Sequence, residues 1–433
     1  MNQHISPLSR AQDIVSEQLI NAEADSVPEP RAPIFASRAA QIVTGLSLVL
    51  IAFNLRPVFS SASALLPEII EQTGLSSFGA GVLTTLPVVC LGVFAPLAPK
   101  LAQRIGAERT LLGVLLLLAL GTALRGFGSL PLLFLGTALA GACIATGNVL
   151  LPGLVKRDFA SRTGMMTGLY TMALCAGAAS AAGFTLPLQR MLSGSWSLAL
   201  GAWALPAVLV ALIWFPHALF RKVRTKHAGF KVEGLWRDRL AWQVTLFMGL
   251  QSALAYCVFG WLSPILRHRG LDGVTAGVVV SVSVMAQVFA CLLVPSIAVR
   301  CKDQRLINVA LVTLAVAGLL GFLFAPLSTV WLWAVIQGLG QGGLIAVAMT
   351  IIVLRSGDSH VASHLSGMAQ CIGYMLAAVG PLLVGLIHSV TGGYGTTAIL
   401  FVLLGLGVAI FGWGAGRATH VKARTIQIQR ISA

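Results

Sequence analysis

One arginine stands inside a long apolar run and is the side chain best suited to bind a polar solute. Arg56 belongs to the stretch Asn54-Leu55-Arg56-Pro57, within the nearly uncharged run from Ile42 to Ile70. If this run crosses a membrane as a helix, Arg56 lies near mid-depth, because a helix rises about 1.5 Å per residue. A charge at that depth is costly, so we expect it in a cavity or against a partner. The alternative is a purely structural Arg56, tied to helix carbonyls.

The residue after Arg56 changes the helix that carries it. Pro57 has no backbone N–H to donate, so the carbonyl of Phe53 is left free and the helix is expected to bend. Ser60 and Ser63 follow Arg56 at i+4 and i+7 and therefore share its face. The stretch thus predicts a polar stripe at a bend.

Other polar side chains lie inside apolar runs and are candidates for the same site, because amides are expensive in hydrocarbon. Each single glutamine has an alternative role as a hydrogen-bonded link between two helices. Together with Arg56, the predicted substrate-binding residues are Asn54, Asn148, Tyr170, Thr171, Gln251, Gln287, Gln341 and Gln370.

No Asp or Glu lies well inside an apolar run, so the one mid-membrane charge is positive. A guanidinium binds planar anions through forked hydrogen bonds, which predicts an anionic or electron-rich substrate group. A carboxylate proton relay is not visible. His388 could titrate, although a single histidine in such a place is more often structural.

The sequence contains no nucleophile–base arrangement, metal-ligand cluster or P-loop, so we expect no catalytic site, no metal and no cofactor. Gly338 to Gly343 matches a dinucleotide-binding glycine pattern, but no strand precedes it and it lies within an apolar run. The seven cysteines are scattered and contain no Cys-x-x-Cys pair.

Composition places the chain in a membrane. It has 433 residues, of which 57% are hydrophobic and only 10% charged, whereas soluble domains carry about 25% charged residues. The net charge of +15 would suggest nucleic acid in a soluble protein. Here basic cytoplasmic loops are the simpler cause, and no nucleic-acid partner is expected.

Twelve apolar runs are each near the length that crosses a bilayer. They predict an all-α polytopic membrane protein with twelve transmembrane helices. The runs are 39–67, 77–99, 110–128, 131–154, 164–189, 196–216, 240–265, 273–298, 306–325, 330–354, 361–388 and 394–416.

Lys and Arg gather on alternate loops. They are frequent in both tails, in the middle loop and in the loops that follow the second, fourth and eighth runs. The opposite side has only Arg125, Arg190, Arg267 and Arg269. By the positive-inside rule both termini are cytoplasmic, and we expect a multi-pass protein of the cell (inner) membrane, in contact with the lipid bilayer.

The chain repeats itself at an offset of 196 residues. Pro99 to Arg109 matches Pro295 to Arg305 in the positions of Pro and Arg. Two parallel six-helix halves are a known transporter plan. The predicted organisation is a disordered cytoplasmic tail (1–38), a first half (39–216), a cytoplasmic linker (217–239), a second half (240–416) and a cytoplasmic tail (417–433).

Amides, threonines and tyrosines inside the runs occur in helices 1, 2, 4 and 5 and in helices 7, 8, 10 and 11. Helices 3, 6, 9 and 12 have no Asn or Gln well inside them. We therefore expect eight helices to line a central cavity and four to face lipid.

Several motifs carry a resemblance to a known family. Leu101 to Arg109 resembles the loop between helices 2 and 3 of the major facilitator superfamily, although Gln103 stands where that loop commonly has an acid. Asn54 to Pro57, Gly147 to Phe159 and Met166 to Thr171 resemble the CynX/NimT family within it, which includes cyanate permeases and 2-nitroimidazole transporters. The resemblance implies the fold of that superfamily and alternating access by rocking of two halves.

The expected function is secondary active transport of a small polar solute, anionic or planar, such as cyanate. Arg104, Arg109, Arg300 and Arg305 are predicted to shape a cytoplasmic gate. We expect a monomer that binds a small molecule, with a proton as a candidate coupling ion. Efflux of nitroheteroaromatic or other drug-like compounds is the alternative within transport. A membrane-embedded enzyme or sensor is the rival from another class; without a catalytic constellation, the chain is not expected to be an enzyme.

Overall fold

The computed structural model describes residues 38–159, 162–220, 230–357 and 359–427. Within these ranges the chain is almost entirely helical, and twelve segments are long and apolar enough to cross a membrane. The predicted all-α class with twelve spans is therefore confirmed. Residues 1–37 of the predicted N-terminal tail and residues 221–229 of the predicted linker lie outside the described residues.

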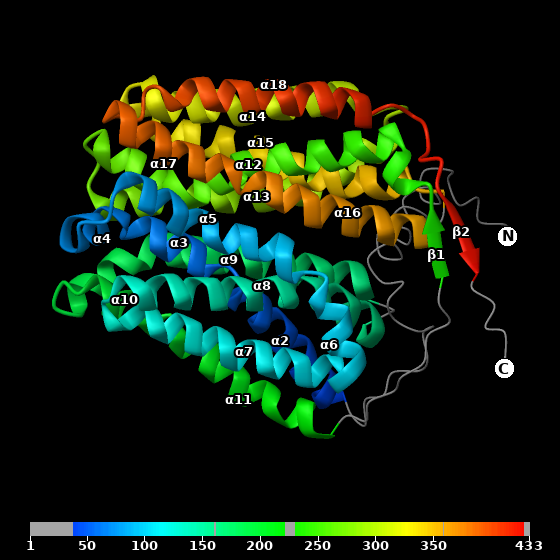
Figure 1. Ribbon diagram of the computed structural model, residues 1–433, viewed down its shortest axis with the longest axis horizontal. Coiled ribbons are helices and arrows are strands. Elements are labelled where there is room, and N and C mark those ends of the chain that lie inside the picture. Colours follow the sequence, from blue (N-terminus) through cyan, green and yellow to red (C-terminus); the bar gives the residue numbers. More distant parts are fainter. Residues whose placement is uncertain (1–37, 160–161, 221–229, 358, 428–433) are drawn as a thin grey trace, which may run out of the picture.

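Helices account for both halves of the molecule (Figure 1). The first half comprises α2 (Arg38–Asn54), α3 (Pro57–Ala64), α4 (Leu66–Thr73), α5 (Ser77–Phe94), α6 (Leu97–Ile105), α7 (Ala107–Leu124), η1 (Arg125–Phe127), α8 (Leu130–Asp158), α9 (Thr163–Met191), α10 (Trp196–Ala202) and α11 (Ala204–Phe220). The second half comprises η3 (Leu235–Arg237), α12 (Arg239–His268), α13 (Gly273–Arg300), α14 (Arg305–Phe324), η4 (Leu327–Thr329), α15 (Val330–Leu354), α16 (Ser359–Ala377), α17 (Val379–Thr391) and α18 (Thr397–Ala415).

Several predicted spans are broken, and the breaks lie next to prolines. The helices α3, α4, α11 and α17 each carry a proline in their first three positions, namely Pro57, Pro67, Pro206 and Pro381. A proline is tolerated there because the first N–H groups of a helix have no intrahelical partner. One apolar run thus becomes two helices that continue each other with a bend.

The bundle has two ends, which we name by the elements found there. The strands β1 (Phe230–Glu233) and β2 (Arg424–Gln427) and the helix α6 lie at one end, called the tail end, and α4 and α10 lie at the other, called the far end (Figure 1). By the distribution of Lys and Arg, the tail end is predicted to be cytoplasmic.

The four helices predicted to face lipid lie at the outer edges. In Figure 1, α14 and α18 form one edge of the molecule, and α7 and α11 form the opposite edge. All four expose large apolar side chains, including Leu120 on α7, Leu212 on α11, Leu306 on α14 and Ile410 on α18. Such surfaces suit contact with lipid tails rather than with water.

The buried core joins the halves at the far end. The apolar cluster of the second half also contains Leu65, Leu66 and Ile69, which belong to the first half. A separate cluster occupies the rest of the first half, around Leu48, Leu111 and Trp214.

A small sheet links the predicted linker to the C-terminal tail. β1 (Phe230–Glu233) pairs with β2 (Arg424–Gln427) in antiparallel orientation, with Phe230 opposite Gln427. The sequence analysis named no helix or strand in either segment. A two-stranded sheet depends on pairing between distant segments, which local sequence patterns do not reveal.

Candidate functional site

Arg56 lies at the break between α2 and α3. It precedes Pro57, the first residue of α3, and its backbone has φ −115° and ψ −25°. Pro57 cannot donate to the carbonyl of Phe53, and Gly177 of α9 packs directly against that carbonyl oxygen. A Cβ at Gly177 would collide with it, so α9 approaches α2 closely at the predicted free carbonyl.

The guanidinium of Arg56 is surrounded by aromatic rings from both halves. Its Cζ lies 5.9 Å from the ring centroid of Phe59 on α3 and 5.9 Å from that of Phe259 on α12. Tyr256 on α12 and Tyr374 on α16 are close enough to the guanidinium to interact with it electrostatically. The distances from Arg56 to the rings of Phe59 and Phe259 are both within the range of cation–π attraction.

These rings contact one another across the boundary between the halves. The centroid of Tyr256 is 5.5 Å from Phe59, 6.2 Å from Phe259 and 6.2 Å from Tyr374. We call Phe59, Tyr256, Phe259 and Tyr374 the aromatic cluster. The sequence analysis missed all four, because aromatic residues in apolar runs look like ordinary core.

No carboxylate pairs with Arg56 among the residues that the structure describes. The residue is half-buried.

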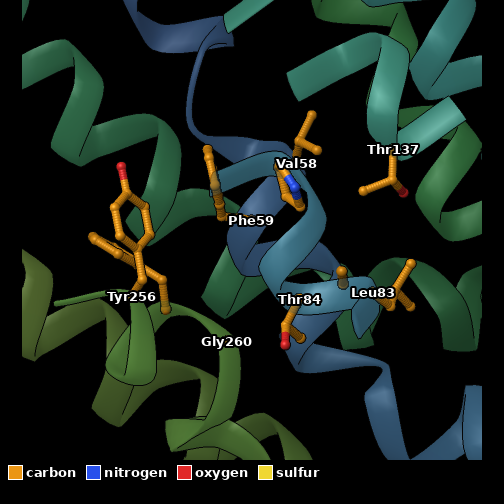
Figure 2. A pocket seen from close by; sticks show the side chains of 10 residues that line it. Val58, Phe59, Leu83, Thr84, Thr137, Tyr256 and Gly260 are labelled. Carbon is orange, nitrogen blue, oxygen red and sulfur yellow. The ribbon is translucent and has the colours of Figure 1, made fainter. Parts of the chain in front are cut away.

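A small cavity adjoins the aromatic cluster (Figure 2). Its volume is about 10 Å³, enough for roughly one water molecule. Residues of both halves line it: Val58, Phe59, Ala62, Leu83, Thr84, Pro87, Thr137, Tyr256, Phe259 and Gly260.

Two of the predicted amide contacts, Asn54 and Gln251, are hydrogen-bonded within their own half. Asn54 Nδ2 donates to the carbonyl of Leu50, 2.9 Å away in its own helix. Gln251 is fully buried within the second half, where Gln341 Nε2 donates to its carbonyl at 3.0 Å and to its Oε1 at 3.2 Å. The described residues show no hydrogen bond between Asn54 and Gln251.

The remaining predicted contacts differ in their burial and in their hydrogen-bond partners. Gln370 donates to Ser366 in its own helix, and Gln287 is buried with no partner for Nε2 in the described part of the chain. Asn148, Tyr170 and Thr171 are half-buried on α8 and α9. Their roles as substrate contacts stay predictions.

The four predicted gate arginines do not come together as one group. Arg104 and Arg300 are exposed, Arg109 Nε donates to the carbonyl of Ala218 at 3.4 Å, and Arg305 lies 5.4 Å from the ring of Trp413. At the tail end, each half instead has one arginine that is bound to several acceptor groups. We call each such arginine, together with its partners, a clamp.

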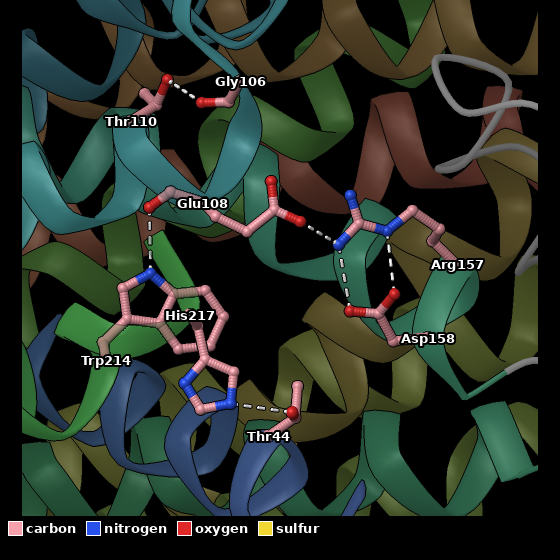
Figure 3. A network of polar contacts seen from close by, with 8 residues as sticks. All are labelled: Thr44, Gly106, Glu108, Thr110, Arg157, Asp158, Trp214 and His217. Atoms are coloured by element: carbon pink, nitrogen blue, oxygen red, sulfur yellow. Dashed lines mark hydrogen bonds and ion pairs between the residues drawn. The ribbon is translucent and has the colours of Figure 1, made fainter. Parts of the chain in front are cut away.

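In the first half, the clamp centres on Arg157 of α8 (Figure 3). Its Nη2 lies 2.5 Å from Oε1 of Glu108, and its Nε lies 2.8 Å from Oδ1 of Asp158. Burial alone would lower the pKa of Arg157, but the charges and hydrogen bonds of the two carboxylates raise it. Trp214 Nε1 adds a 3.0 Å bond to the carbonyl of Glu108, which ties α11 to α7.

The second half repeats this clamp with an amide in place of the acid. Arg355 donates to Oε1 of Gln304 and to the carbonyls of Ala415 and Gly416. Burial lowers the pKa of Arg355, and the charge of Asp303 opposes this shift only in part. Glu108 and Gln304 are 196 residues apart, which is the repeat offset, so this offset could have revealed the clamps.

At the far end, polar contacts join the two halves. Arg267 binds Glu68 through two bonds of 2.7 and 2.8 Å and also donates to the carbonyl of Ala64. His388 Nδ1 is 2.9 Å from Oγ of Ser77. His388, which the sequence suggested could titrate, is thus a link between the halves in this conformation.

Two other contacts complete the description of the far end. Ser281 of the second half donates to the carbonyl of Ala179 at 2.7 Å. Arg125, expected on the outer side, is fully buried at the end of α7, and its Nη2 lies 3.4 Å from Oγ of Ser61. The halves are therefore held together at the far end.

Comparison with known families and proteins gives consistent matches over most of the chain. The model of the Major Facilitator Superfamily matches residues 48–336. The Bacillus subtilis (strain 168) protein named Uncharacterized transporter YycB is 40% identical, covering 88% of this chain and 94% of the relative.

Two Escherichia coli (strain K12) relatives have more specific names. The 2-nitroimidazole transporter is 38% identical over 88% of this chain and 97% of its own length. The Cyanate transport protein CynX is 31% identical over 81% of this chain and 91% of its own length.

A solved structure shows the same fold. A bacterial homologue of the human lysosomal transporter Spinster, in an inward-facing and occupied conformation, has a TM-score of 0.71 and 16% identity. The match covers 88% of this chain and 97% of that one.

Proposed function

The chain belongs to the Major Facilitator Superfamily and is a transporter of the type of the CynX and 2-nitroimidazole carriers, and from this premise we propose that it carries a small anionic or nitro-bearing solute held by Arg56. The solute would bind between the halves. It would cross the membrane by alternating access, as the two halves rock about the site.

The observation that carries this proposal is the state of Arg56. A guanidinium within a transmembrane segment is costly unless something compensates it, and the described residues give it aromatic rings but no carboxylate. Two oxygens in a plane match the fork of a guanidinium. Carboxylates and nitro groups both present such a pair.

Two candidate substrates have specific support. Cyanate is a compact anion that can accept hydrogen bonds from a guanidinium, and one relative at 31% identity is named for cyanate transport. A nitroheteroaromatic compound suits the rings around Arg56, and a relative at 38% identity is named for 2-nitroimidazole.

Orientation in the membrane follows from the Lys and Arg distribution. With the tail end in the cytoplasm, the bonded far end faces outward, and the present conformation is closed to the outside. The bacterial relatives support a location in the inner membrane.

A ligand panel tests the function directly. Purified protein is melted with cyanate, benzoate, 2-nitroimidazole or imidazole, and uptake of each is then followed in proteoliposomes. We expect at least one anion or the nitro compound to raise the melting temperature, and imidazole, which lacks the nitro group, to have no effect. Arg56→Gln should remove the shift. A wild-type protein that neither binds nor moves any member of the panel would refute the proposal.

A further inference from the structure

The aromatic cluster places rings of the second half against the charged group of the first. Arg56 and Phe59 belong to the first half, whereas Tyr256, Phe259 and Tyr374 belong to the second. Tyr256 touches the other three rings of the cluster, at 5.5, 6.2 and 6.2 Å. It is 4% exposed and stands where the two halves meet at Arg56.

We propose that Tyr256 and Phe259 form the substrate-selecting wall of the Arg56 site, where a flat conjugated ring of the substrate stacks while its anionic or nitro group binds the guanidinium. The inference rests on the proposed transport function. It deepens it by assigning the substrate class, a planar aromatic anion or nitroarene, and the residues that select it.

The chemistry of the site supports this division of labour. A guanidinium provides the forked donors for two coplanar oxygens. Aromatic faces favour offset or edge contacts with a second ring at centroid distances of 4.5–7 Å, the range already found within the cluster. A saturated ring of similar size has no π-system and is not flat, so it gains less from such a wall.

The present conformation explains how binding could be linked to movement. Tyr256 lies beside Arg56 and approaches it from the second half. A substrate group that binds the guanidinium takes the place of the Tyr256 hydroxyl next to it, while the substrate ring keeps a contact with Tyr256 or Phe259. The substrate then connects one half to the other, in a place where the empty protein has direct contacts between the halves and room for about one water.

The test compares two carboxylates that differ only in the ring. Benzoate is flat and conjugated, and cyclohexanecarboxylate is neither. We expect wild-type protein to bind benzoate at least tenfold more tightly in calorimetry. Tyr256→Phe should keep that ratio but change the rate of transport, because the ring stays and the hydroxyl is lost. Tyr256→Leu and Phe259→Leu should reduce the ratio towards one while both acids still bind.

Controls separate this inference from the transport function. Tyr394→Phe removes the hydroxyl of a tyrosine in the far-end loop, outside the aromatic cluster, and should change neither ratio nor rate. Equal affinity of the wild type for the two acids, or a ratio that persists in Tyr256→Leu and Phe259→Leu, would overturn the selecting wall and leave an anion carrier. If neither acid binds the wild type, melting and uptake of the panel above decide whether the transport proposal fails as well.

Discussion

At the scale of single residues, Arg56 combines a charge with an irregular backbone. The break before Pro57 places the guanidinium at a helix end, so its side chain extends between the halves rather than along one helix. The rings around it supply attraction without neutralising the charge. A charge arranged in this way stays available for an incoming anion.

Replacement of Arg56 by lysine separates geometry from charge. Arg56→Lys keeps the positive charge but loses the planar fork. We expect substrate affinity to fall by about 1–3 kcal/mol, the scale of a hydrogen bond to a charged group, while the melting temperature stays near that of the wild type. Calorimetry and a thermal melt measure the two effects.

The opposite pattern would assign Arg56 a structural role. In that case, Arg56→Lys and Arg56→Gln would lower the melting temperature, because carbonyls inside the membrane would lose their donor. Binding per folded molecule would stay unchanged.

At the scale of elements, the contact between α2 and α9 depends on a missing side chain. Gly177 packs against the free carbonyl of Phe53, and a Cβ there has no space. We expect Gly177→Ala to lower the melting temperature, because overpacking costs about 1–3 kcal/mol. Gly113→Ala on α7 is the matched control, since a Cβ at Gly113 meets nothing within 4 Å. Equal melting temperatures for the two variants would show that α2 and α9 can separate without cost.

The arginines of the two tail-end clamps bind different side chains: Arg157 binds Glu108, and Arg355 binds Gln304. We expect Glu108→Gln to be tolerated better than Glu108→Leu, because the amide can accept from Arg157 as Gln304 does from Arg355. The difference should be about 1 kcal/mol, the net size of one hydrogen bond, since Arg157 is partly exposed and Asp158 still binds it. Melting temperatures of the two variants give the order, and Gln304→Leu tests the second clamp. A Glu108→Leu protein as stable as Glu108→Gln would mean that the clamp is not needed for folding.

At the scale of the whole molecule, polar contacts join the halves at the far end, and we expect them to act as a gate. The pair Glu68–Arg267 joins α4 to α12 with two bonds, and His388 adds a bond to Ser77. Thr84 is buried behind these contacts, on the wall of the small cavity. Opening of the gate should therefore expose position 84 to the far side.

Neutralising the gate pair should shift the equilibrium towards an open far end. In a background without the seven native cysteines, Thr84→Cys is labelled from the far side with an impermeant reagent. If the pair contributes about 1–2 kcal/mol, Arg267→Gln should raise the labelling rate about 5- to 30-fold. The exchange of charges, Glu68→Arg with Arg267→Glu, should restore slow labelling. Met191→Cys, at an exposed far-end position, serves as the reference for reagent access. Unchanged labelling in Arg267→Gln would remove the pair from the gate.

Much of the architecture can be predicted from local sequence patterns. Twelve apolar runs of membrane-spanning length, the 196-residue repeat and the unpaired Arg56 are readable without coordinates, because each depends on composition or spacing along one segment. The bend at Pro57 is equally local, since it follows from a missing N–H.

Tertiary structure decided which of the polar residues meet. Gln251 and Gln341 bind each other within one half, and Arg157 binds Glu108. The aromatic cluster consists of rings from α3, α12 and α16. These contacts join residues far apart in the chain, and an apolar run gives the same periodic signal whether its aromatic side chain faces lipid, core or substrate. Only the packing of one half against the other brings Tyr256 to Arg56.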